Sequence, residues 1–160
     1  MRTAFILSIL SLISSISFAG GAGTVGPGSP AALFCMGLKS ESVTIKHSNG
    51  GESGLCVVDG AAVADFTLLW ELKYKIPQEA LTVFIEHPAA QGSTGENPSS
   101  QYCVQVGGAL EIVFAKSSNK NLGLCRFSDR SAIEVETLYR GPSSPENKKL
   151  TELLLLNLKN

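Results

Sequence analysis

Two parts of this 160-residue chain carry a pair of cysteines at almost the same spacing, and this feature constrains the fold most. Cys103 and Cys125 are 22 residues apart, and Cys35 and Cys56 are 21 residues apart. In both parts the first cysteine follows a Pro-containing helix start, and the second follows a Gly-Leu dipeptide. We therefore interpret the first part, residues 29–76, as a diverged copy of the second.

The second copy, residues 96–142, contains local signals for two helices and two strands. Asn97 can accept a hydrogen bond at a helix start, Pro98 tolerates the first helical position, and Gly107-Gly108 suits a helix end. Apolar and polar residues then alternate over two short segments separated by a polar turn, which is typical of a β-hairpin. The predicted helices and strands cover residues 98–106, 109–114, 122–127 and 130–139.

The first copy keeps the same order of elements. Ser29-Pro30 stands at the helix start, Ser48-Asn49-Gly50-Gly51 is a strong hairpin signal, and residues 61–72 carry apolar side chains at helical spacing. We therefore predict an α+β protein of two tandem α-β-β-α modules, each stapled by one disulfide, with an additional C-terminal helix.

The repeated spacing also selects a cysteine pairing. Four cysteines allow three connectivities, and a pairing within each copy gives Cys35–Cys56 and Cys103–Cys125. A core of about 45 residues is marginal by itself, and each bridge should stabilise its copy by roughly 3 kcal/mol. Zinc is disfavoured because the cysteines are far apart in sequence and the chain carries an export signal.

An ordered set of residues in the second copy follows the pattern N-P-x-S-x-Y-C-x-x-x-G-G, then L-E-I, then G-x-C-x-F-x-D, and ends in Y-R-G. The matching residues are Asn97, Pro98, Ser100, Tyr102, Cys103, Gly107, Gly108, Leu110, Glu111, Ile112, Gly123, Cys125, Phe127, Asp129, Tyr139, Arg140 and Gly141. This pattern resembles a bacterial family of unknown function whose members often carry the label haemolysin. Members commonly have two further cysteines near the last helix, where this chain has Ile133 and Ser143, so the resemblance implies one bridge fewer here.

The remaining segments are a targeting signal, connecting segments and a final helix. Residues 1–19 combine Arg2, an apolar run and a small-x-small site at Ala19, so we expect export and cleavage rather than an uncleaved anchor. The mature protein is then periplasmic or extracellular. The other segments are a Gly-rich lead-in, a joint with a linker, and the C-terminal helix, at residues 20–28, 77–95 and 143–160. Residues 77–87 fit a helix or a strand, and their β-branched and aromatic run favours the strand.

Charge and histidine placement argue against several function classes. Without Arg2 the chain has 12 basic and 14 acidic residues, and their interspersed arrangement gives no support to nucleic-acid binding. His47 and His87 occupy unrelated positions, so neither copy has a recurring catalytic histidine, and we expect no enzymatic activity, cofactor or metal. Asp59 and Asp129 recur beside turns, where capping of the following helix is the expected role.

The sequence favours an exported, non-enzymatic binding protein with an unknown envelope or extracellular protein as its partner. The predicted interaction surface combines hairpin tips and recurring aromatic residues, namely Asn49, Gly50, Trp70, Asn119, Lys120 and Tyr139. Two alternatives remain open. One is a membrane-active protein whose Leu150–Leu156 helix, too short to span a bilayer, lies on its surface. The other is an extracytoplasmic protease inhibitor that presents a hairpin loop.

Overall fold

The computed structural model describes residues 28–92 and 97–159, so the predicted signal and most of the Gly-rich lead-in lie outside the described residues. In chain order the elements are α1 (Pro30–Gly37), β1 (Glu41–Lys46), β2 (Glu52–Val58), β3 (Ala61–Ala64), α2 (Asp65–Leu68), the π-helix η1 (Leu69–Lys73), α3 (Glu79–Glu86), α4 (Pro98–Gln105), β4 (Ala109–Ala115), β5 (Lys120–Arg126), β6 (Ala132–Glu134), α5 (Val135–Arg140), the 3-10 helix η2 (Pro145–Asn147) and α6 (Lys148–Leu158).

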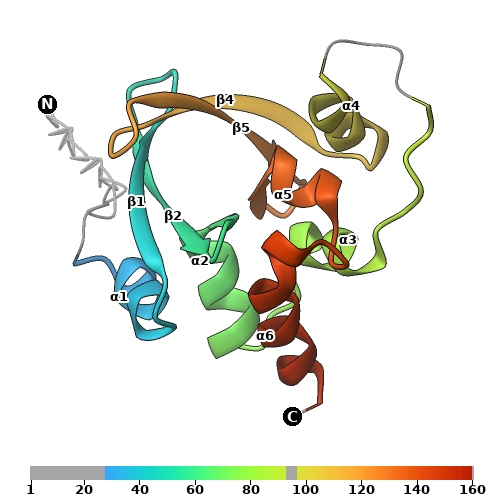
Figure 1. Ribbon diagram of the computed structural model, residues 1–160. Coiled ribbons are helices and arrows are strands. Elements are labelled where there is room, and N and C mark those ends of the chain that lie inside the picture. The colour runs from blue at the N-terminus through green and yellow to red at the C-terminus, as the bar shows by residue number, and fades with distance from the viewer. Residues whose placement is uncertain (1–27, 93–96, 160) are drawn as a thin grey trace, which may run out of the picture.

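Within the described residues, the strands form one closed antiparallel barrel in the order β1-β2-β3-β6-β5-β4. Each half of the chain contributes a three-stranded meander, and the two meanders meet at two seams. Ile45 lies opposite Ala115 at one seam, and Val63 lies opposite Ile133 at the other. In Figure 1 the long β4–β5 hairpin arches over the barrel towards α4, while α1 lies on the opposite side.

This barrel shows that the predicted fold of two tandem α-β-β-α modules is wrong. The content is still a mixture of helices and strands, but strands from residues 29–76 and 96–142 share one sheet. The physical reason lies in the sheet edges. A two-stranded hairpin leaves rows of backbone N–H and C=O groups unpaired, and closure into a barrel removes those edges.

The strands that allow closure, β3 and β6, lie inside segments that the sequence predicts as helix. Both are short and begin with alanine, which favours helix when considered locally. Tertiary pairing overrides this preference. A reciprocal pair of hydrogen bonds then secures the β3–β6 seam, because Thr67 Oγ1 accepts from the Ala132 N–H at 3.0 Å and Thr137 Oγ1 accepts from the Ala62 N–H at 2.9 Å.

The barrel separates the buried apolar residues into two clusters. The interior cluster is small and consists of Val43, Ile45, Leu55, Ala62, Val113, Ala115 and Leu124, with Val57 and Leu122 partly buried against it. A larger cluster joins outward-facing strand residues to the helices, and it includes Phe84, Tyr102, Leu138 and Leu150. The helices therefore cover the outside of the barrel, whereas modest side chains fill its inside.

The two predicted disulfides are confirmed, and each joins a helix to the middle strand of its half. Cys35 on α1 bridges to Cys56 on β2, and Cys103 on α4 bridges to Cys125 on β5. Gly108 makes the second bridge possible, since a Cβ at this position would lie 2.2 Å from Cys125 Sγ.

The joint between the halves forms helix α3, so the strand preferred for residues 77–87 is wrong. Ala80, Leu81 and Phe84 are buried at helical spacing, and this one-sided burial outweighs the β-branched run. Asp129 lies far away in sequence but accepts a hydrogen bond from the Glu79 N–H at 2.8 Å. It therefore caps α3 rather than the helix that follows it.

The predicted C-terminal helix is present as α6, which packs on the barrel through Leu150 and Leu154. The Asn147 side chain donates to Thr137 O and Gly141 O, and these bonds fix the start of α6 against α5. In the part of the chain that the structure describes, every helix is too short or too polar to cross a bilayer.

Candidate functional site

The structure places the six predicted surface residues in separate regions. Because β1 and β4 run antiparallel, the turn with Asn49 and Gly50 and the turn with Asn119 and Lys120 point in opposite directions. Trp70 lies on η1 beside Tyr74, with 5.1 Å between the ring centroids. Tyr139, also partly exposed, packs edge-on against Tyr102. The barrel brings together other residues, and these form its two ends.

A network of polar side chains closes one end of the barrel. His47 Nδ1 lies 2.6 Å from Glu111 Oε1, and His47 Nε2 lies 2.7 Å from Ser53 Oγ. Arg126 donates to the other oxygen of Glu111 through Nε at 2.9 Å and Nη2 at 2.7 Å. Burial would raise the pKa of the Glu111 carboxyl, but hydrogen bonds from Arg126 and His47, together with their charge, hold this pKa below its ordinary value.

The order Ser53, His47, Glu111 matches the connectivity of a serine-hydrolase triad. A carboxylate can only accept, so in the neutral imidazole Nδ1 carries the proton and Nε2 accepts from the Ser53 hydroxyl. In a catalytic triad the carboxylate stabilises a charged imidazole, but in this protein the Glu111 carboxylate is paired with the Arg126 guanidinium. The four side chains satisfy one another, and we interpret the network as a plug that fills the barrel end.

The opposite end of the barrel has apolar residues at the equivalent positions. One residue after the bridged cysteine, β2 has Val57 where β5 has Arg126. The pairing register of each hairpin identifies further equivalent positions. Val43 lies opposite Leu55 in the first half, and Glu111 lies opposite Leu124 in the second half. In this way Val43, Val57, Ala115 and Leu122 are the counterparts of Glu111, Arg126, His47 and Ser53.

Smaller side chains leave this second end hollow. The hollow, here called the mouth, has a volume of about 400 Å³. Its lining residues are Glu41, Val43, Leu55, Val57, Gly60, Ala62, Ala115, Ser117, Ser118, Leu122, Glu134, Glu136 and Arg140. Ligand sites in proteins are usually apolar hollows of this size with a few polar groups at defined places, so the mouth is the candidate site.

The polar residues of the mouth are held by their own contacts. The Glu134 side chain accepts from the N–H groups of Glu136 and Thr137, at 3.0 and 2.7 Å, and is only 9% exposed. Arg140 Nη2 donates to Gly60 O at 3.2 Å, whereas its buried Nε has no hydrogen-bond partner among the described residues. The mouth therefore offers a fixed carboxylate, Glu134, beside an apolar wall.

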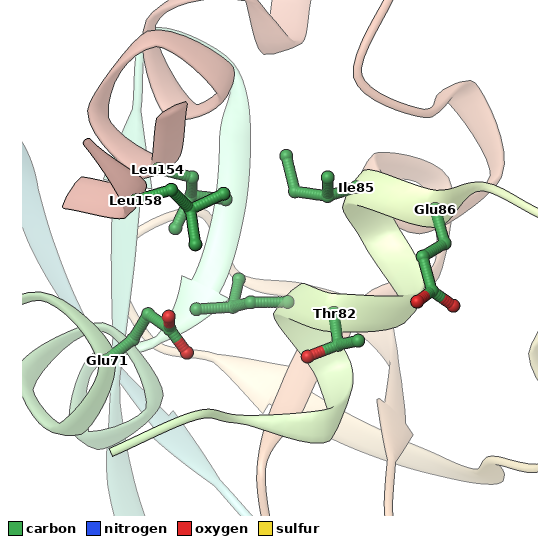
Figure 2. Close-up of a pocket in the computed structure, with 7 residues that line it drawn as sticks. Glu71, Thr82, Ile85, Glu86, Leu154 and Leu158 are labelled. Carbon is green, nitrogen blue, oxygen red and sulfur yellow. The ribbon is translucent and has the colours of Figure 1, made fainter. Parts of the chain in front are cut away.

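A second hollow, of about 220 Å³, lies between η1, α3 and α6. Figure 2 shows Leu154 and Leu158 of α6 facing Ile85 of α3, with Glu71 and Glu86 on different sides. Glu71 is already engaged, because its Oε2 accepts from the Gln78 N–H at 2.8 Å. This hollow is smaller than the mouth and lies outside the barrel, in the layer of helices.

Comparison with known proteins finds one family model that matches part of the chain. Residues 95–142 match the model of a domain of unknown function (DUF333), which covers α4, the β4–β6 meander and α5. No curated protein and no solved structure matches the chain significantly. The match covers less than half of the chain and shows only that residues 95–142 are similar to a family whose function is not established. The haemolysin label and the interpretation of residues 29–76 as a second copy do not follow from it.

Sequence reasoning missed both the plug and the mouth. Glu111 and Arg126 meet within the β4–β5 hairpin, and His47 and Ser53 meet at the β1–β2 hairpin. The two pairs come together only because β1 and β4 pair when the barrel closes. One signal was present: inward-facing positions that are apolar in one hairpin are charged in the other, as at Val57 and Arg126. Among the described residues, no group of three or more His, Cys, Asp or Glu side chains is placed so that it could hold a metal ion.

Proposed function

We propose that this protein is an exported, non-enzymatic binding protein that takes a small ligand into the mouth of its barrel. The observation that carries this proposal is the difference between the two ends. Equivalent positions hold long, mutually bonded side chains at one end and short apolar side chains around a hollow at the other. The fold fills one end of the barrel with side chains and leaves a hollow at the other end, and such a hollow can hold a ligand.

The scaffold around the mouth is suited to a preformed site. Each half is fixed by a disulfide between a helix and a strand, and barrel closure links both halves. A rigid site binds with little loss of conformational entropy. Disulfides persist in oxidising compartments, which agrees with the signal expected at residues 1–19 and supports a ligand from the periplasm or the medium.

Binding of a neutral fluorescent probe, N-phenyl-1-naphthylamine, tests the proposal. Val57→Phe should weaken binding at least about tenfold, because the larger ring fills the mouth. The pair Val43→Glu with Val57→Arg should do the same by copying the Glu111–Arg126 pair of the plug. Circular dichroism and thermal unfolding would establish that each variant is folded.

The matched control is Leu158→Ala, which enlarges the hollow of Figure 2 and leaves the mouth unchanged. We expect this control to bind the probe like the parent protein. Failure of the parent to bind, or a loss of binding in the control but not in Val57→Phe, would reject the mouth as the site.

The plug also allows a test that distinguishes the proposed binding function from hydrolase activity. With Ser53 bonded inside the barrel end and Glu111 neutralised by Arg126, we expect no reaction with a fluorophosphonate probe of activated serines. Covalent labelling of Ser53 in the folded protein, abolished in His47→Ala, would show instead that the network is catalytic.

One observation favours a second candidate function, association with a membrane surface. Leu155 and Leu158 on α6 are 44% and 68% exposed, although the same helix buries Leu150 and Leu154. A helix with apolar side chains on a solvent-facing side can lie in the bilayer interface. Dye leakage from anionic vesicles should then fall in a Leu155→Gln, Leu158→Gln variant. Equal, negligible leakage from both proteins removes this candidate.

A further inference from the structure

We infer that the ligand of the mouth is an organic cation, an aliphatic amine whose hydrocarbon part lies against the barrel wall. This inference rests on the proposed function, because it names the chemical class that the same hollow would hold. It follows from the charges around the mouth and from the apolar wall beneath them.

The lining of the mouth is acidic. Glu41, Glu134 and Glu136 contribute three carboxylates and Arg140 contributes one guanidinium, so the formal charge of the lining is −2. Charges that border an apolar hollow interact more strongly than charges in open water. A positively charged group at the rim is therefore favoured over a neutral group, and an anionic group is disfavoured.

Arg140 is held beside the mouth by a hydrogen bond, because its Nη2 donates to Gly60 O at 3.2 Å. The carboxylates accept hydrogen bonds, but none of the three forms an ion pair among the described residues. Glu136 accepts from Ser99 through Oε1, and Glu134 accepts from the N–H groups of Glu136 and Thr137 and from the Thr137 hydroxyl, so neither is paired with a cation.

The apolar wall of the mouth determines the chemistry of the uncharged part of the ligand. Val43, Leu55, Ala62 and Ala115 belong to the interior cluster, with Val57 and Leu122 packed against it. These side chains form an apolar surface that a hydrocarbon chain can cover, which removes apolar area from water on both partners. A small inorganic cation would leave this wall uncovered and would lack the ligand cluster that metals require.

The test uses three probes of equal chain length, octylamine, octanol and octanoate, in competition with N-phenyl-1-naphthylamine at neutral pH. Octylammonium should displace the neutral probe at a concentration about tenfold lower than octanol, and octanoate should be the weakest competitor. The preference for the amine should shrink as salt is raised, because salt screens exposed charges.

The matched variants are Glu41→Gln with Glu136→Gln at the rim, and Glu152→Gln on α6 as a control that does not line the mouth. We expect the rim variant to lose the preference for the amine while it still binds the neutral probe, and the control to keep both. Glu134 is left unchanged because it caps α5.

The outcomes distinguish an error in the ligand class from an error in the proposed binding function. If the neutral probe binds in the mouth but octylamine and octanol compete equally, the ligand class is wrong and the binding function stands. An amine preference that survives in the rim variant also overturns the class. If the neutral probe does not bind at all, the proposed function fails, and with it this inference.

Discussion

At the scale of single residues, the two halves differ most where a charge replaces an apolar group. Val135 packs over Gly123 in the second half, and its Cγ2 would lie 2.9 Å from a Cβ at that glycine. The corresponding place in the first half is occupied by Asp65, whose carboxylate lies over Gly54. Asp65 is fully buried, its Oδ1 accepts from the Phe66 N–H, and its Oδ2 is unpaired among the described residues.

Asp65→Asn should therefore stabilise the folded protein at neutral pH. Burial raises the pKa of Asp65 above its ordinary value, and the hydrogen bond from Phe66 offsets only part of this effect. A raised pKa means that ionisation lowers stability as the pH rises through that pKa, whereas below the ordinary value the acid is protonated in both states. We expect a gain of about 1–2 kcal/mol at neutral pH that disappears in acid. Urea unfolding at several pH values measures it, and a gain that is independent of pH would contradict it.

Glu111→Gln in the plug should show the opposite pH dependence. The lowered pKa of Glu111 means that its contribution is present at neutral pH and is lost as the pH falls through that pKa. The variant leaves Arg126 without its charged partner, so we expect a loss of about 1–2 kcal/mol at neutral pH and a smaller loss in acid. The same urea series measures it, with Glu152→Gln as an exposed control that should change stability little.

At the scale of elements, the β3–β6 seam depends on hydrogen bonds that cross between the halves. Thr67→Val and Thr137→Val each leave a buried backbone N–H, at Ala132 and Ala62, without its acceptor. We expect each variant to lose about 1–3 kcal/mol of stability and the pair to be non-additive, because both bonds secure one seam. Hydrogen exchange at the two amides should accelerate in both variants. Acceleration confined to the amide next to the substitution would show that the seam does not act as one unit.

The sequence predicted the local elements better than their assembly. Cysteine pairing, the hairpins and the helix starts at Pro30 and Pro98 could be predicted because cap residues, turn residues and spacing are local signals. Strands β3 and β6 could not, since alanine-rich segments favour helix until a distant partner pairs with them. Helix α3 was missed for a similar reason, because its buried side depends on the barrel against which it packs. The mouth exists only because the strands close into a barrel, so it could not be predicted from the sequence without the barrel.

At the scale of the whole molecule, a shared barrel and two separate modules predict different unfolding behaviour. The halves share one sheet, and the larger apolar cluster draws on both, so neither half keeps its core alone. We expect one cooperative thermal transition that shifts as a whole when either bridge is removed, by Cys35→Ser with Cys56→Ser or by Cys103→Ser with Cys125→Ser. The expected loss is about 3 kcal/mol for each bridge. Calorimetry measures this, and two transitions, of which only one moves, would favour independent modules.

The seams that complete the barrel are short, with Ile45 and Lys46 of β1 facing Ala115 and Phe114 of β4 at one of them. Each contact across a seam joins one half of the chain to the other, and the same contact can form between halves of two different molecules. We therefore predict that two chains can trade meanders and build the same barrel twice, and size-exclusion chromatography of concentrated protein would detect such an exchanged dimer. In such a dimer each mouth would be assembled from residues of both chains.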